Sequence, residues 1–156
     1  MFSKILKKIL VPYDGSSYSK KALARAMELA HNLDSEIILI NVVNLSYIAP
    51  PGGLQGLIKG KSKKSPMEKW KKSVKNNAKK MLESCVRKCK SNGVTASYVI
   101  KDGNISQEIL DFAKKRKTTL IIIGSQGLAG ISKLKTLGSV SRKVSEQAHC
   151  PVLIVR

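Results

Sequence analysis

Short apolar runs alternate along this chain with longer segments of helical character, and this alternation constrains the fold more than any other feature. Four of the runs lie at residues 9–11, 37–40, 120–123 and 152–155. Runs this apolar are typical of strands in a parallel sheet, because such a sheet is covered on both faces. The alternation predicts an open, mostly parallel, five-stranded α/β sheet with helices on both faces.

The expected element boundaries follow from the apolar runs and from the residues that can end them. We expect strands at residues 7–13, 36–43, 95–100, 120–123 and 152–155. We expect helices at residues 17–33, 67–92, 107–117 and 138–148. Ser16 or Ser17 can cap the first helix and Asn104 or Ser106 the third, while Gly93 suits the end of the second.

A glycine-rich segment follows the fourth expected strand. Gly124, Gly127 and Gly130 come after it, and Gly138-Ser139 opens the last expected helix. Glycines let the backbone approach a phosphate, and the free N–H groups of a first helical turn point at it. The segment could also supply two hydroxyl donors and two positive charges, from Ser139, Ser141, Lys133 and Lys135.

The spacing of these glycines excludes two common phosphate-binding motifs. No Gly-Lys-Ser/Thr sequence closes the loop as in a Walker A motif, and the G-x-G-x-x-G dinucleotide fingerprint is absent. A Gly-x-x-Gly also occurs in RNA-binding KH domains, but there it joins two helices. A tight strand-to-helix connection would use the same glycines for positive φ. The residues alone leave phosphate binding and this connection equally open.

The glycine-rich segment and both ends of the chain resemble the universal stress protein family. Gly124-x2-Gly127 followed by Gly138-Ser139 resembles the family's nucleotide-binding signature, and residues 9–16 and 138–155 resemble its ends. The similarity covers nearly the whole chain and is weakest at residues 44–70. The chain departs from the pattern in one respect. Ten residues separate Gly127 from Gly138, whereas the family's ATP-binding members usually have nine.

The resemblance implies a single domain over residues 1–156, with a flexible loop insertion at residues 44–66. It also implies the strand order 3-2-1-4-5, in which a crevice opens between the first and fourth strands. ATP or AMP would occupy this crevice, with Mg²⁺ able to bridge the phosphates. The implied ligand residues are Pro12, Asp14 and Val42 on the nucleoside side, Ile123, Gly124 and Gly127 in the middle, and Gly138, Ser139, Val140 and Ser141 at the phosphates.

The last expected strand, residues 152–155, would form an apolar edge of the sheet, which invites pairing. The family's dimers pair through this strand, so the resemblance implies a homodimer. The implied function is regulatory: the protein would adopt a nucleotide-dependent conformation that a partner recognises in a stress response. The alternative is a dimeric interaction module that binds no nucleotide, and the longer spacer favours it.

Positive charge is concentrated in one part of the chain. The net charge is +19, and residues 59–90 hold 13 of the 29 basic residues against Glu68 and Glu83. A solvated helix face that keeps the protein soluble explains this charge. The alternative is a surface for nucleic acid or another polyanion. Because only Trp70 could stack on bases there, we favour the solvated face.

Cysteines and histidines form no pattern typical of a metal or catalytic site. Cys85 and Cys89 share one face of the expected helix with apolar residues, which predicts buried thiols. His31 lies in the first expected helix and His149 at the end of the last one, so neither is at the crevice. The residues do not indicate an enzyme, and phosphate positioning would allow at most slow ATP hydrolysis. The run at residues 9–11 is too short for a signal-peptide core, so the expected location is the cytoplasm.

Overall fold

The computed structural model of the protein describes residues 6–45, 66–128 and 136–156. Its strands are β1 Lys8–Pro12, β2 Glu36–Val43, β3 Ala96–Asp102, β4 Leu120–Gly124 and β5 Val152–Val155. Its helices are α1 Ser17–Leu33, α2 Pro66–Ser91, α3 Ile105–Lys115 and α4 Ser139–Gln147. Gly130, Lys133, Lys135 and nearly all of the 44–66 segment lie outside the described residues, so the expectations for them stay untested.

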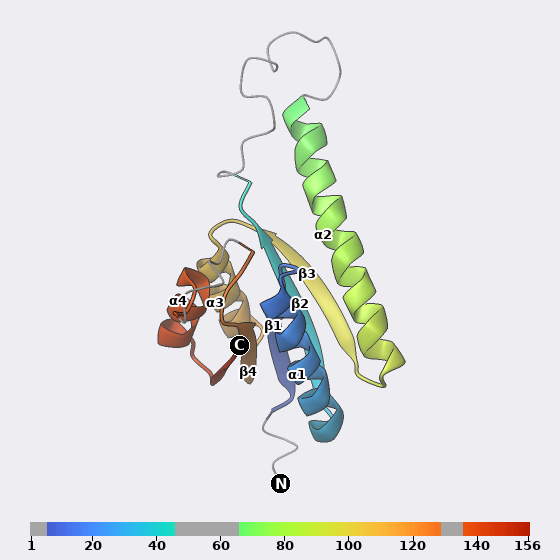
Figure 1. Ribbon diagram of the computed structural model, residues 1–156, viewed down its shortest axis with the longest axis vertical. Helices are drawn as coiled ribbons and strands as arrows, with labels where there is room; N and C mark the ends of the chain where they lie inside the picture. Colours follow the sequence, from blue (N-terminus) through green and yellow to red (C-terminus); the bar gives the residue numbers. More distant parts are fainter. Residues whose placement is uncertain (1–5, 46–65, 129–135) are drawn as a thin grey trace.

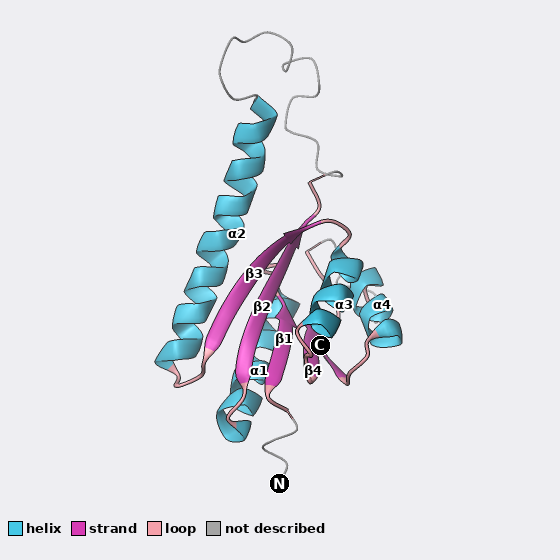
Figure 2. Cartoon of the chain, turned by 180° about the vertical axis from the view of Figure 1, so that it is seen from behind, coloured by secondary structure: helices cyan, strands magenta, loops and turns pink. Residues whose placement is uncertain are grey.

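The strands form one parallel sheet in the order β3-β2-β1-β4-β5, which confirms the predicted order. Helices α1 and α2 cover one face, and α3 and α4 cover the other, as the two opposite views show (Figures 1 and 2). Because β1 pairs with both β2 and β4, the loops that follow β1 and β4 leave the sheet side by side. The order reverses at this point.

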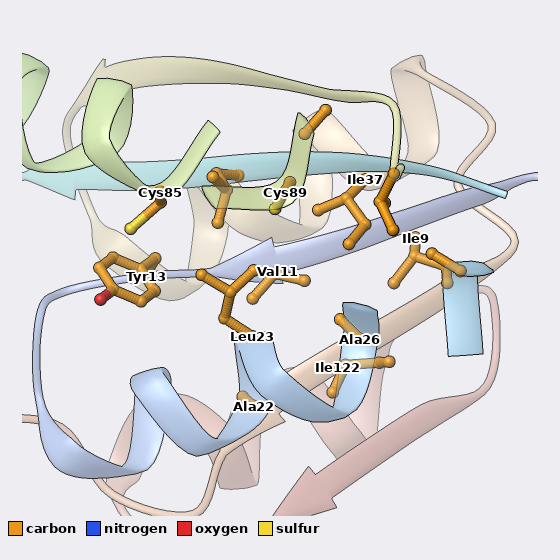
Figure 3. Close-up of a cluster of buried hydrophobic side chains, with 14 of the residues drawn as sticks. Ile9, Val11, Tyr13, Ala22, Leu23, Ala26, Ile37, Cys85, Cys89 and Ile122 are labelled. Carbon is orange, nitrogen blue, oxygen red and sulfur yellow. The ribbon is translucent and has the colours of Figure 1, made fainter. Parts of the chain in front are cut away.

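Alternate residues of the strands build two cores, one on each face of the sheet. Ile9 and Val11 of β1 pack toward α1 and α2 (Figure 3). Leu10 points the other way and packs with Ile109 of α3 and Val144 of α4. All of these side chains are fully buried, and burying each one stabilises the fold by about 1.5–3 kcal/mol. This packing fixes the C-terminal ends of β1 and β4 at the same edge.

Helix and strand ends differ from the predicted ones by one or two residues, for local reasons. Helix α3 begins at Ile105, because Asn104 caps it: the Asn104 Oδ1 accepts a hydrogen bond from the Gln107 N–H at 3.1 Å. The helix ends at Lys115 instead of Lys117, since Lys117 adopts a φ of 52°. The third strand continues past its predicted end at Ile100, because Asp102 still pairs with Val43 of β2.

Helix α2 has 26 residues, which corresponds to a length of about 39 Å at 1.5 Å per residue. Its buried residues lie between the middle of the helix and its C-terminal end and face the sheet: Ala78, Leu82, Cys85 and Cys89. The helix ends before Gly93, whose φ of 73° favours glycine. The N-terminal half extends past the ends of the strands (Figure 1).

Candidate functional site

The carboxylate of Asp14 joins the end of β1 to the loop that follows β4. Its Oδ1 accepts a hydrogen bond from the Ser16 N–H at 2.9 Å, and its Oδ2 accepts one from the Leu128 N–H at 3.1 Å. The preceding carbonyl, of Tyr13, accepts a hydrogen bond from the side-chain amide of Asn41 in β2 at 2.8 Å. The turn after β1 is therefore held from both neighbouring strands.

Gly127 lets Asp14 approach the loop. A Cβ atom at position 127 would lie 2.9 Å from Asp14 Oδ2, closer than side-chain carbons approach other atoms. Gly15 is restricted in two ways, because its φ is 83° and a Cβ there would lie 2.9 Å from the Met81 Sδ of α2. Gly127 thus makes room for the Asp14 carboxylate, whereas Gly15 follows from its positive φ and from the packing of Met81.

Gly124 has a packing role that the sequence did not reveal. A Cβ at this position would lie 2.7 Å from the Tyr18 carbonyl carbon, so only glycine lets the first turn of α1 approach β4. Gly124 also pairs with Val155 of β5 and is buried. This packing accounts for the glycine, and its predicted role in ligand contact stays a prediction.

The first turn of α4 presents backbone N–H groups beside the glycine loop. Gly138 caps the helix without a side-chain hydrogen bond, and its own N–H donates to the Ser125 carbonyl at 2.8 Å. The N–H groups of Ser139 and Val140 come before the first hydrogen bond of the helix, which Arg142 donates to Gly138. The N-terminus of a helix carries partial positive charge and favours anions.

The two serines of this turn differ in their surroundings. Ser139 is exposed, so its hydroxyl can reach a ligand. Ser141 is buried, and its Oγ lies 2.8 Å from the Ser125 carbonyl oxygen and 3.0 Å from that of Gly138. Its hydroxyl proton is therefore used within the protein, and it fastens α4 to the end of β4.

A cavity of about 320 Å³ lies beside the start of α4. Its lining contains the predicted residues Ser139 and Val140, together with polar residues that the motif did not indicate: Asn44, Asn104, Ser106 and Lys143. Lys143 lies four positions after Ser139 and so on the same face of the helix, a signal that the sequence contained. The sequence predicts Asn104 as a helix cap, and the structure adds that it lines the cavity.

The structure brings some of the predicted residues into direct contact and places others nearby. Hydrogen bonds connect Asp14 with the Gly127 loop, and the end of β4 with Gly138. Pro12 lies beside Ile40 in the sheet, two residues before Val42. Val42 and Ile123 belong to the α3/α4 side of the sheet, the side on which α4 begins.

The face of the sheet opposite the cavity carries buried groups that stay uncharged. Tyr13 points toward Cys85 of α2 (Figure 3). Burial, followed by a hydrogen bond and an electrostatic interaction with Cys85, raises the pKa of Tyr13 well above its usual 10. Burial raises the pKa of Cys89 to about 11. On the α3/α4 side of the sheet, burial also raises the pKa of Cys150. Cys85 and Cys89 are buried free thiols, as predicted.

Over the residues that the structure describes, no group of three or more His, Cys, Asp or Glu side chains could hold a metal ion. In the same ranges no helix combines the length and the apolar character that crossing a membrane requires.

Comparisons with known proteins agree with this architecture. The profile of the universal stress protein family matches residues 6–156. The chain is 35% identical over 152 residues to universal stress protein YxiE of Bacillus subtilis, covering 97% of this chain and 100% of that protein. It is 36% identical over 154 residues to a universal stress protein of Methanocaldococcus jannaschii, covering 97% and 83%.

Solved structures show the same fold. The universal stress protein UspA from Lactobacillus plantarum superposes with a TM-score of 0.80 at 22% identity, over 97% of this chain and 98% of that one. Three more distant neighbours were solved with nucleotides: a family member with cAMP, one from Archaeoglobus fulgidus with dAMP and one from Arabidopsis thaliana with AMP, at TM-scores of 0.68, 0.66 and 0.63. The chain belongs to the universal stress protein family.

Proposed function

We propose that this protein binds an adenine nucleotide, ATP or AMP, at the sheet edge between β1 and β4 and acts as a regulatory stress protein. The observation that carries the proposal is the contact between Asp14 and the Leu128 N–H, 3.1 Å long. It joins the two segments that flank the reversal of strand order, where open α/β sheets bind ligands. The three neighbours that hold cAMP, dAMP or AMP support the adenine nucleotide as the ligand class.

Each part of the site has a chemical role in this proposal. The Asp14 carboxylate accepts hydrogen bonds from ribose hydroxyls or the adenine amino group, next to Pro12 and Val42. Since each carboxylate oxygen has two lone pairs, the bonds to Ser16 and Leu128 leave capacity for a ligand. Ile123, Gly124 and Gly127 line the middle of the crevice.

The phosphates would lie at the first turn of α4. The backbone N–H groups of residues 139–141 and the Ser139 hydroxyl supply hydrogen-bond donors, and Gly138 keeps the approach open. Lys143 lines the adjoining cavity and adds positive charge. Mg²⁺ could bridge the phosphate oxygens and would use few protein ligands. Ser141, by contrast, holds the turn in place through its bonds to Ser125 and Gly138.

Calorimetry on protein stripped of nucleotide tests the proposal. ATP, AMP and cAMP are titrated into the natural protein, the D14N variant and the D102N variant. Asp102 ends β3 as Asp14 follows β1, but it lies away from the reversal of strand order, so it is the matched control.

We expect D14N to lose at least about tenfold in nucleotide affinity, since a hydrogen bond to a charged group contributes about 1.5–3 kcal/mol. D102N should bind like the natural protein. If the natural protein gives no heat with any of the three nucleotides at millimolar concentration, the proposal is wrong and a dimeric interaction module takes its place.

We also propose a homodimer that pairs along β5, the outer strand on the β4 side of the sheet. Leu153 supports this, because it is 37% exposed in a strand that is otherwise partly buried. A single domain in the cytoplasm completes the proposal.

A further inference from the structure

Helix α2 carries a charged surface that the nucleotide site does not use. Its 26 residues include nine lysines and arginines, and only two acids, Glu68 and Glu83. The nine basic residues are all exposed: Lys69, Lys71, Lys72, Lys75, Lys79, Lys80, Arg87, Lys88 and Lys90.

Five of these side chains form a row on the side of α2 that faces away from the sheet. At about 100° per residue, Lys69, Lys80 and Arg87 lie nearly opposite the buried Ala78. Lys72 and Lys90 lie about 60° to one side of these three residues around the helix axis. From Lys69 to Lys90 the row is about 32 Å long. We refer to these five residues as the outer row.

The N-terminal half of α2 adds charge on its inner side. Lys71 lies two turns before Ala78 and so on the same side of the helix as Ala78 and Cys85, yet it is exposed while they are buried. The N-terminal half of α2 extends past the ends of the strands (Figure 1), so the sheet does not cover this half of the helix. Uncharged polar residues would be enough to keep a projecting helix soluble. The lysines at these positions therefore suggest a further role for the positive charge.

Glu83 lies between the charges of the outer row but has partners of its own. It is 3.8 Å from the Lys79 Nζ, and its Oε1 accepts a hydrogen bond from the Tyr98 hydroxyl of β3 at 3.3 Å. These contacts direct its carboxylate toward β3 and Lys79, so the outer row keeps most of its positive potential.

The chemistry of this surface selects among polyanions. The exposed large hydrophobic residues of the described chain are Ile105, Leu128 and Leu153, and none belongs to α2. The apolar residues of its N-terminal half, Met67, Trp70 and Val74, are half-buried, which disfavours insertion into a membrane. The one aromatic residue of α2, Trp70, is half-buried, and a single ring offers little stacking surface for single strands. A straight row of about 32 Å matches nearly one turn of B-DNA.

We propose that the outer row of α2 binds the phosphate backbone of double-stranded DNA without reading its base sequence. Lysine and arginine neutralise backbone phosphates and release counterions, a contribution that does not depend on sequence. Five such contacts predict that log K falls with log salt with a slope of about −4 to −5.

Fluorescence anisotropy with a labelled duplex of about 20 base pairs, between about 50 and 200 mM salt, tests this. The full chain is compared with K72Q/K80Q and with K114Q/K115Q. The second pair is exposed at the end of α3 and changes the net charge equally. A single strand of the same sequence and vesicles with anionic lipid are the other probes.

We expect K72Q/K80Q to weaken duplex binding at least tenfold at about 100 mM salt and to reduce the slope by about 2. K114Q/K115Q should change neither. Equal weakening by both variants, absence of duplex binding at the lowest salt, or stronger binding to the single strand or the vesicles would each overturn the proposal. Nucleotide titration of K72Q/K80Q should match the natural protein, so this test and that of the nucleotide site fail independently.

Discussion

Asp14 Oδ2 accepts a hydrogen bond from the backbone N–H of Leu128 at 3.1 Å, although 114 positions separate the two residues in sequence. The bond closes the gap between the end of β1 and the loop after β4, and Gly127 makes the approach possible. One carboxylate therefore both shapes the crevice and is its best candidate for ligand contact.

We expect Asp14→Ala to loosen the loop even without a ligand. A hydrogen bond to a charged group contributes about 1.5–3 kcal/mol, so the Leu128 amide should exchange with solvent about 10- to 100-fold faster. Hydrogen exchange followed by NMR measures this. Asp102→Ala is the control, because its bond to the Leu45 N–H is long, at 3.5 Å. Unchanged exchange at Leu128 would mean that Asp14 does not hold the loop in solution.

Alanine at two glycines should have very different costs. Gly124→Ala places a Cβ 2.7 Å from backbone of α1, so α1 must shift and the free energy of unfolding should fall by more than about 3 kcal/mol. Gly93→Ala meets no atom within 4 Å and loses only the ease of its positive φ, about 1–2 kcal/mol. Urea unfolding compares the two variants. Equal losses would refute the packing role of Gly124.

The serines at the start of α4 should separate binding from stability. Ser141→Ala removes the buried bonds to Ser125 and Gly138 and should cost about 1 kcal/mol of stability. Ser139→Ala removes an exposed hydroxyl, so thermal stability should not change while nucleotide affinity falls a few-fold. Thermal unfolding and calorimetry on both variants check this pair. If Ser139→Ala instead lowered stability and Ser141→Ala lowered only nucleotide affinity, the assignment of the two roles would be wrong.

Alkaline pH should destabilise the protein through Cys89. Burial raises the pKa of this thiol from 9.0 to about 11, so the unfolded chain loses the proton at lower pH than the folded chain. The protonated thiol therefore contributes about 2–3 kcal/mol to the free energy of unfolding. This contribution is fully present below pH 9 and is lost as the pH rises toward 11. The raised pKa of Tyr13 acts in the same direction above pH 10.

Urea unfolding across this pH range measures the effect on the natural protein, Cys89→Ala and Cys150→Ala. The Cys89 variant should lose less stability between pH 9 and 11 than the natural protein. The Cys150 variant retains Cys89, so it should lose nearly as much stability between pH 9 and 11 as the natural protein. Parallel pH curves for all three proteins would contradict the prediction.

The proposed dimer depends on the outer face of β5. We expect Leu153→Lys to shift the protein from dimer to monomer, because charge on an edge strand blocks pairing. Ile105→Lys is a suitable control, since Ile105 is 38% exposed and Leu153 37%, but it lies at the start of α3. Sedimentation velocity measures both variants. A natural protein that is monomeric at all concentrations would rule out the dimer.

The amino-acid sequence by itself determined the elements and their order. Apolar runs such as residues 37–40 are short and lack polar alternation, which favours strands with both faces covered. Local chemistry placed the caps, as at Ser16, whose Oγ accepts a hydrogen bond from the Ser19 N–H at 3.1 Å. The glycine pattern indicated a candidate phosphate site, and the family resemblance supplied the strand order that the sheet confirms.

The tertiary structure decided what each of these residues does, because those roles depend on neighbours that are distant in sequence. Gly124 is a glycine because α1 packs against β4, and Ser141 faces inward because a carbonyl of β4's loop lies beside it. The exposure of Lys71 likewise follows from where the sheet ends, while Cys85, on the same side of α2, is buried. Periodicity identifies the face of a helix, but only the fold determines whether anything covers that face.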